Sequence, residues 1–158
     1  MTPIQHWYFE RDLEEAHHFN QAVLLELRRE VPAEVLERAG QELQRHHDAL
    51  RLRFRPVGSG WVQEFAGEEC GSPFARVDLG DVEDAELSLA VTRAAERAQA
   101  SLDMGSGPVW RMVLMDPGRD RPRRLLLAAH HLVAVSYTHL RAHETTSLIS
   151  YAVFCLKK

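Results

Sequence analysis

Residues 124–133 read Arg-Leu-Leu-Leu-Ala-Ala-His-His-Leu-Val and form the most apolar stretch of the chain. A second apolar run, Val109-Trp-Arg-Met-Val-Leu-Met115, precedes it, and the turn-forming residues Pro117-Gly-Arg-Asp120 lie between the two. Apolar runs of this length, bounded by turn residues, are typical of buried strands. We therefore predict two neighbouring central strands, the second of which ends at the histidine pair His130-His131.

Segments with other periodicities lie on the N-terminal side of these strands. Apolar residues at helical spacing predict three helices, at residues 3–11, 32–46 and 84–102. Short continuous or alternating apolar runs predict further strands, at residues 21–27, 50–54, 61–65 and 74–79. We expect the tryptophans to pack in the core or against the sheet. The order of elements predicts an α/β fold, in which helices pack on a mixed sheet.

The composition is that of one globular domain, with 158 residues, 45% of them hydrophobic and 27% charged. A net charge of -4 argues against a nucleic-acid partner, which requires a basic surface. The sequence shows neither a signal peptide nor an apolar stretch of roughly 20 residues, so we expect a cytoplasmic protein without a membrane partner. Cys70 and Cys155 are too few for a disulfide framework or a cysteine zinc site.

The pair His130-His131 has two interpretations on local pattern alone. Polar residues at the end of a buried strand are where α/β folds bind ligands, and a neutral imidazole can accept or donate a proton near physiological pH. Alternatively, the pair has no chemical role, as for the similar pairs His17-His18 and His46-His47. Because no acidic or cysteine partners stand at ligand spacing, we predict no metal site.

Five motifs follow one another within residues 2–133. They are Pro3-Ile-Gln-His-Trp-Tyr-Phe-Glu10, His18-Phe-Asn-Gln21, His46-His-Asp-Ala-Leu-Arg-Leu-Arg-Phe54, Ser101-Leu-Asp103 with Gly107-Pro108, and Leu125-Leu-Leu-Ala-Ala-His-His-Leu-Val133. Together they resemble the N-terminal subdomain of the condensation superfamily of nonribosomal peptide synthetases, which make secondary metabolites. The first two motifs are more similar to epimerization domains than to peptide-bond-forming condensation domains.

This resemblance implies the N-terminal half of a chloramphenicol-acetyltransferase-like α/β fold, whose two halves enclose a tunnel. In the family motif HHxxxDG the second histidine, here His131, is catalytic, and the first, here His130, supports it. In an epimerization domain this histidine and a glutamate of the second half invert the α-carbon of an aminoacyl or peptidyl thioester. In a condensation domain it would assist attack by the acceptor amine. A third hypothesis is a non-catalytic module that only docks a carrier protein.

The resemblance also implies the partners of the parent enzyme. We expect peptidyl carrier protein domains and other synthetase domains of the same chain. No cofactor is expected to bind directly, because the substrate is carried on the phosphopantetheine of the carrier protein. The parent domain is expected to be an enzyme. The present chain is expected to be inactive, because it lacks the second half.

The family pattern stops after Ala134, since the aspartate expected at position 135 is replaced by Val135. Residues from Val135 to Thr145 match one reading frame of a common transposase sequencing adaptor, and Ile149 to Lys158 match its outer end. Both lysines of the chain lie in this part, whereas every earlier basic residue is an arginine. We therefore interpret residues 1–134 as a truncated N-terminal subdomain and residues 135–158 as an artefactual, non-native tail.

Overall fold

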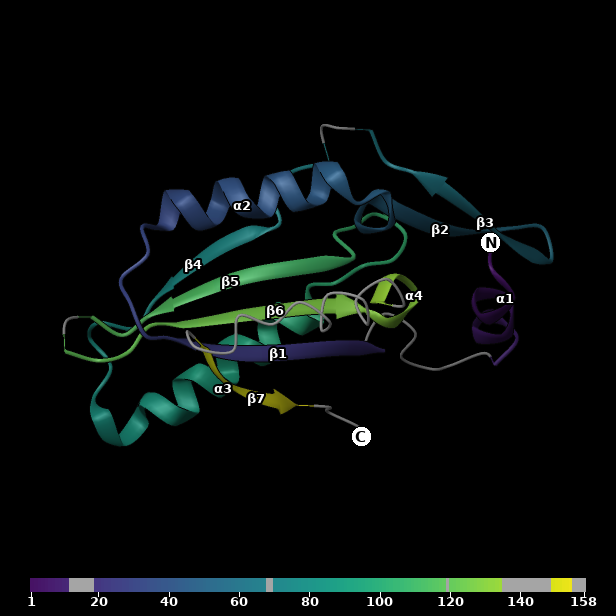
Figure 1. The fold of residues 1–158 in the computed structure, drawn as a ribbon. Helices are drawn as coiled ribbons and strands as arrows, with labels where there is room; N and C mark the ends of the chain where they lie inside the picture. The colour runs from purple at the N-terminus through teal and green to yellow at the C-terminus, as the bar shows by residue number, and fades with distance from the viewer. Residues whose placement is uncertain (12–18, 68–69, 119, 135–148, 155–158) are drawn as a thin grey trace.

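The fold is a mixed sheet with helices on both faces, as the computed structural model shows in Figure 1. The structure describes residues 1–11, 19–67, 70–118, 120–134 and 149–154. The helices are α1 (Pro3–Phe9), α2 (Ala33–His46), the 3-10 helix η2 (Asp48–Arg51), α3 (Asp84–Ala100) and α4 (His131–Ala134). The strands are β1 (Asn20–Leu27), β2 (Leu52–Val57), β3 (Gly60–Phe65), β4 (Phe74–Asp78), β5 (Trp110–Asp116), β6 (Arg124–His130) and β7 (Ile149–Phe154).

The two most apolar segments form the centre of the sheet. In the described part of the chain, the main sheet has the order β4-β5-β6-β1-β7, and a separate hairpin consists of β2 and β3. The predicted neighbours β5 and β6 pair antiparallel, with Trp110 opposite Ala129 and Leu114 opposite Leu125. β4 runs parallel to β5. The predicted mixed sheet is confirmed.

Side chains of the central strands alternate between two hydrophobic clusters, as the period of a strand requires. One cluster holds Met112 and Leu114 of β5 and lies on the side of α2, where Leu36 and Leu43 pack against it. Figure 1 shows α2 and α3 on opposite sides of the sheet. Gln44 of α2 is buried and accepts a hydrogen bond from the Trp110 Nε1–H, at 3.0 Å.

The second cluster lies on the side of α3. It combines Val113 and Met115 of β5 with Val91, Ala94 and Ala98 of α3, all of which are buried. Small alanines on this face of α3 allow the helix to lie close to the strands. Hydrophobic side chains therefore cover both faces of β5.

β1 begins beside the histidine pair. It pairs antiparallel with β6 from Asn20 opposite His130 to Glu26 opposite Arg124. Its other edge pairs with β7, which belongs to the segment that we interpret as adaptor-derived. An edge strand offers unpaired N–H and C=O groups to any extended segment within reach. A non-native segment could therefore pair with β1 as well as a native one.

The expected helices and strands agree with the observed ones to within one to a few residues at their ends, and the expected α/β fold with packed helices is confirmed. One expectation about side chains is wrong. Trp7 is 48% exposed rather than packed in the core, and the guanidinium of Arg11 lies 4.1 Å from its ring centroid. Among the side chains of α1 that the structure describes, Gln5 and Tyr8 are the buried ones. Among the helices that the structure describes, none is both long and apolar enough to cross a membrane.

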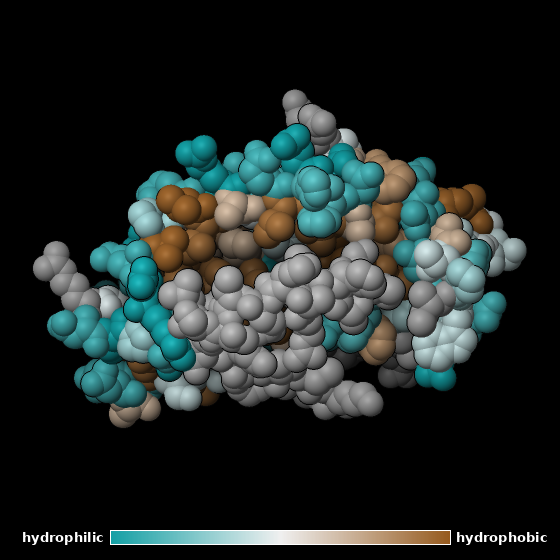
Figure 2. Space-filling model, in the orientation of Figure 1, coloured by the Kyte–Doolittle hydropathy of each residue, from teal (hydrophilic) through white to brown (hydrophobic). Residues whose placement is uncertain are grey.

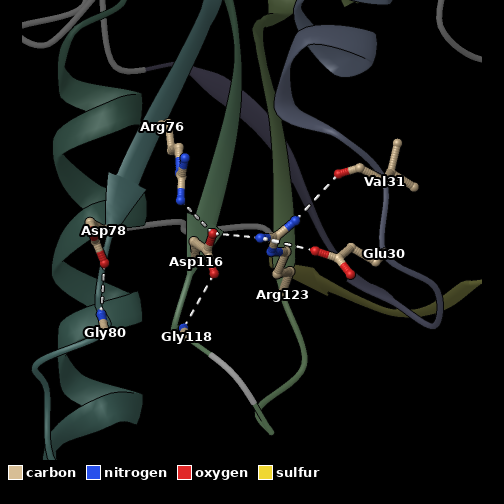
Figure 3. A network of polar contacts seen from close by, with 8 residues as sticks. All are labelled: Glu30, Val31, Arg76, Asp78, Gly80, Asp116, Gly118 and Arg123. Atoms are coloured by element: carbon tan, nitrogen blue, oxygen red, sulfur yellow. Dashed lines mark hydrogen bonds and ion pairs between the residues drawn. The ribbon is translucent and has the colours of Figure 1, made fainter.

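A network of charged groups lies at the end of the sheet where β5 ends and β6 begins (Figure 3). The histidine pair lies at the other end of β6. The buried Asp116 at the end of β5 accepts hydrogen bonds from Arg76 of β4, at 2.7 Å, and from the Gly118 N–H, at 3.2 Å. Arg123 lies 2.9 Å from the same carboxylate and 3.6 Å from Glu30. The network therefore joins three neighbouring strands and the loop before α2.

Candidate active site

The histidine pair lies where β6 ends and α4 begins, as the sequence predicts. The His130 N–H donates to the carbonyl of Val109, at 2.9 Å, on the β5 side. The His131 N–H donates to the carbonyl of Phe19, also at 2.9 Å, on the β1 side. The two backbone groups are therefore held by both neighbouring strands, which fixes the position at which the chain turns into α4.

His130 is part of the interior, with 1% of its surface exposed. Its Nδ1 accepts a hydrogen bond from the Leu132 N–H at 3.2 Å, so this nitrogen carries no proton. The ring of Tyr8 meets it edge-on, with centroids 5.7 Å apart. Burial raises the pKa of Tyr8 to about 12, so its phenol stays protonated. The His130 imidazole thus contacts the turn that leads into α4.

His131 is the histidine of the pair that reaches the surface, since it is only partly buried. Burial lowers the pKa of its imidazole below the ordinary value of 6.5. The ring is therefore mostly neutral at pH 7, with one of its two nitrogens unprotonated. A neutral, accessible imidazole on a fixed backbone has the properties that a general base requires.

Two buried polar side chains support this turn, and the sequence analysis missed both. Gln5 of α1 accepts a hydrogen bond from the Thr2 N–H at 2.7 Å and donates one to the Leu132 carbonyl at 3.3 Å. It thereby connects α1 to α4. Gln5 lies three residues before the buried Tyr8, so helical spacing could have indicated that it faces the interior.

The second of these side chains is Asn20, which lies opposite His130 in the sheet and is buried. Its Nδ2 donates to the carbonyl of Gln99 near the end of α3, at 3.1 Å. Its Oδ1 has no hydrogen-bond partner within the part of the chain that the structure describes. Asn20 therefore attaches the start of β1 to α3 beside the histidine pair. Its place in the motif His18–Gln21 was the available signal.

The histidine pair at the end of α2 lies elsewhere in the fold. His46 ends α2 and His47 follows it, with their rings 4.8 Å apart, as expected for a pair at a helix end. His17 lies outside the described residues, as do His18 and the pair His139 and His143. The described residues contain no group of three or more His, Cys, Asp or Glu that could hold a metal ion.

An apolar pocket of about 260 Å³ lies next to α4, between α2 and the sheet. Leu43 and Leu50 line one side, Leu127 and Ala129 of β6 line the sheet side, and Val133 is at its α4 end. Figure 2 shows hydrophobic residues gathered directly below the hydrophilic outer face of α2. Neither histidine of the pair lines this pocket. This apolar pocket is therefore adjacent to the candidate site and separate from it.

The family model described as "Condensation domain" matches residues 1–136. The chain belongs to the condensation-domain family. A linear gramicidin synthase of Brevibacillus parabrevis is 42% identical over 134 residues, and chondramide synthase cmdD of Chondromyces crocatus is 43% identical over 133 residues. These matches cover 84% of this chain, and 2% and 3% of the two relatives, respectively.

Solved structures of the family have the same fold. The epimerization domain from the third module of tyrocidine synthetase B matches with a TM-score of 0.74 and 29% identity, over 89% of this chain and 32% of that one. The first condensation domain of the calcium-dependent antibiotic synthetase matches with a TM-score of 0.68 and 20% identity, over 89% and 37%. The expected chloramphenicol-acetyltransferase-like fold is confirmed.

These comparisons confirm that the chain is part of a nonribosomal peptide synthetase domain of the condensation superfamily. The chain spans about a third of the length of the two solved domains and 2–3% of the two curated relatives. Domains of this family are catalytic in their parent synthetases and act on substrates carried by carrier domains.

Proposed function

We propose that the chain is the N-terminal part of an epimerization domain that inverts the α-carbon of a carrier-bound aminoacyl or peptidyl thioester. The observation that carries this proposal is the state of His131, a partly exposed and neutral imidazole at the start of α4. The likeness to the tyrocidine synthetase epimerization domain, at 29% identity and a TM-score of 0.74, supports the choice of reaction.

In this mechanism His131 accepts the α-proton of the substrate. The electron pair of the broken C–H bond passes into the thioester carbonyl and forms an enolate. A proton donated to the opposite face of the α-carbon by a carboxylic acid, which we assign to a glutamate of the second half, completes the inversion. His130 orients the turn through its Nδ1 and does not contact the substrate. The thioester belongs to the phosphopantetheine arm of a carrier protein domain, which is the partner that we propose.

The competing function is peptide-bond formation, which other domains of the same family carry out. His131 would then assist the attack of an acceptor amine on a donor thioester, and no α-proton would exchange with solvent. A module that only docks a carrier protein would do neither.

The test uses the completed parent domain with an aminoacyl-loaded carrier protein in deuterated solvent. We expect exchange of the α-proton, and His131→Ala should lower its rate by about 10²–10⁴-fold, the usual contribution of a positioned base. The matched control is His46→Ala, which removes an exposed histidine at the end of α2 and should leave the rate unchanged. Peptide bonds formed without exchange would favour condensation, and an unaffected His131→Ala would contradict both catalytic functions.

We also propose the boundary between residues 1–134 and 135–158 as the limit of the native sequence. The family match that ends at residue 136 supports it. Sequencing of the source locus across codons 133–136 should show an open reading frame that continues with Asp at position 135 and encodes a second half-domain. The 158-residue chain itself should show no exchange, because it contributes only one side of the tunnel. A natural reading frame that encodes residues 135–158 would contradict this proposal.

A further inference from the structure

We propose that Phe19 is a positioning residue for His131, which it holds through its backbone carbonyl and through the face of its ring. This inference rests on the proposed function of His131 as the base. Apart from its place in the motif His18–Gln21, Phe19 has no assigned role. It lies directly before β1, and β1 pairs with β6.

The backbone contact determines where the His131 residue lies. The His131 N–H donates to the Phe19 carbonyl at 2.9 Å, immediately beyond the pair Asn20 and His130 in the ladder of β1 and β6. The side chain of Asn20 is bonded to the end of α3. The position of Phe19 is therefore fixed at the start of β1. Its carbonyl in turn fixes the position of His131, the first residue of α4.

The ring contact determines how the imidazole is oriented. The ring centroids of Phe19 and His131 are 4.3 Å apart, with 36° between the planes. The Tyr8 ring lies 5.5 Å from the Phe19 ring and also contacts His130, so Phe19 is supported from the interior. Both nitrogens of an imidazole lie in the ring plane. A contact with the ring face therefore limits rotation and leaves the nitrogen atoms free for proton transfer.

The exposure of Phe19 agrees with this role. The side chain is 41% exposed, which is high for a large apolar residue whose only purpose is core packing. The Phe19 ring packs against the His131 ring, and burial is what lowers the pKa of this histidine. Among the described residues, His130 and the protonated Tyr8 pack beside these rings, and neither adds a negative charge that would favour imidazolium.

The first experiment uses the 158-residue chain and follows the His131 ring by NMR titration, with His131→Gln to assign the signal. We expect Phe19→Ala to raise the pKa of His131 toward 6.5, because the imidazole gains contact with water. Phe19→Tyr keeps the ring and should retain the parent titration. Phe65→Ala is the matched control, because Phe65 is an exposed phenylalanine of β3 that should leave His131 unchanged. An unaltered His131 titration in Phe19→Ala would overturn the proposal.

The second experiment measures α-proton exchange by the completed domain. Phe19→Ala should lower kcat by at least about tenfold with KM within about twofold, since a misplaced base slows the chemical step rather than binding. Phe19→Tyr should restore kcat. Phe19→Leu keeps apolar volume without a flat ring and should reproduce the loss, which covers the case that Phe19→Ala fails to fold. A change confined to KM, or a kcat loss that Phe65→Ala shares, would overturn the positioning role.

The two experiments separate this inference from the proposed function. The titration needs no activity, so it tests the contact between Phe19 and His131 alone. His131→Ala could retain full exchange while Phe19→Ala still shifted the titration. The assignment of His131 as the base would then be wrong, and the effect of Phe19 on the His131 ring would be supported.

Discussion

At His131, the chemistry of one residue depends on how much water reaches its ring. The imidazole is partly buried and the pKa is lowered by this burial, whereas the adjacent His130 is fully enclosed and bonded to the Leu132 N–H. Two identical side chains thus have different surroundings, because one faces the interior and the other begins a helix at the surface. Their order in the chain determines which of them is accessible.

The lowered pKa of His131 predicts that the chain loses stability in mild acid. Below about pH 6.5 the unfolded chain binds a proton at this histidine, whereas the folded chain resists it, so unfolding becomes more favourable until the pH falls below the folded pKa. We expect the urea midpoint to be lower at about pH 5.5 than at about pH 7.5. His131→Gln should show a smaller decrease. An equal decrease in both proteins would show that the acid sensitivity comes from another group.

At the scale of elements, one carboxylate holds three strands together at the far end of the sheet. Burial works to raise the pKa of Asp116, but hydrogen bonds from Arg123 and Gly118, together with the charges of Arg123 and Arg76, lower it overall. The charged form is therefore the one that the folded protein stabilises. The ends of β4, β5 and β6 meet at this point (Figure 3).

Asp116→Asn tests this connection with almost no change in shape. The amide loses the negative charge that Arg76 and Arg123 share, and an incompletely paired group remains next to the core. We expect the free energy of unfolding to fall by about 1–3 kcal/mol. This range is kept low because both arginines are partly exposed, and water screens their charges. Urea denaturation near neutral pH measures it. Glu42→Gln, which breaks an exposed ion pair with Arg45, is the control and should leave the midpoint unchanged. Equal effects of both variants would contradict a structural role for Asp116.

At the scale of the molecule, the chain presents apolar surface on the side of α2. The pocket of about 260 Å³ between α2 and the sheet is lined almost entirely by apolar groups. Contiguous apolar surface of this kind marks a place where another part of a protein packs. The proposed second half-domain and the native continuation of α4 are the segments that would cover this side.

This surface predicts a difference between the chain and the completed domain. We expect the 158-residue chain to bind a hydrophobic dye such as ANS, or to self-associate, at concentrations where the completed domain does neither. Dye fluorescence and sedimentation velocity measure the two properties. A monomeric chain without dye binding would show that the apolar side is already covered.

Much of the fold could be predicted because its signals are local. Continuous apolar runs at 109–115 and 124–129 specified buried strands, and helical spacing specified α2 and α3. Trp7 shows where this reasoning fails. Spacing indicates one face of a short helix, but which face packs inward depends on what the rest of the chain brings against it. In α1 the polar Gln5 is buried together with Tyr8, while Trp7 is exposed.

The sequence was sufficient for the family, the type of fold and the residue that we propose as the base, because each rests on an ordered motif or on a periodic pattern. The surroundings of that residue required the tertiary structure. Phe19 contacts His131, and Gln5 contacts Leu132, only because β1 pairs with β6 in one register and α1 packs beside α4. Contacts between distant segments depend on burial and register, which no local pattern encodes. The state of His131 is therefore a property of the folded molecule.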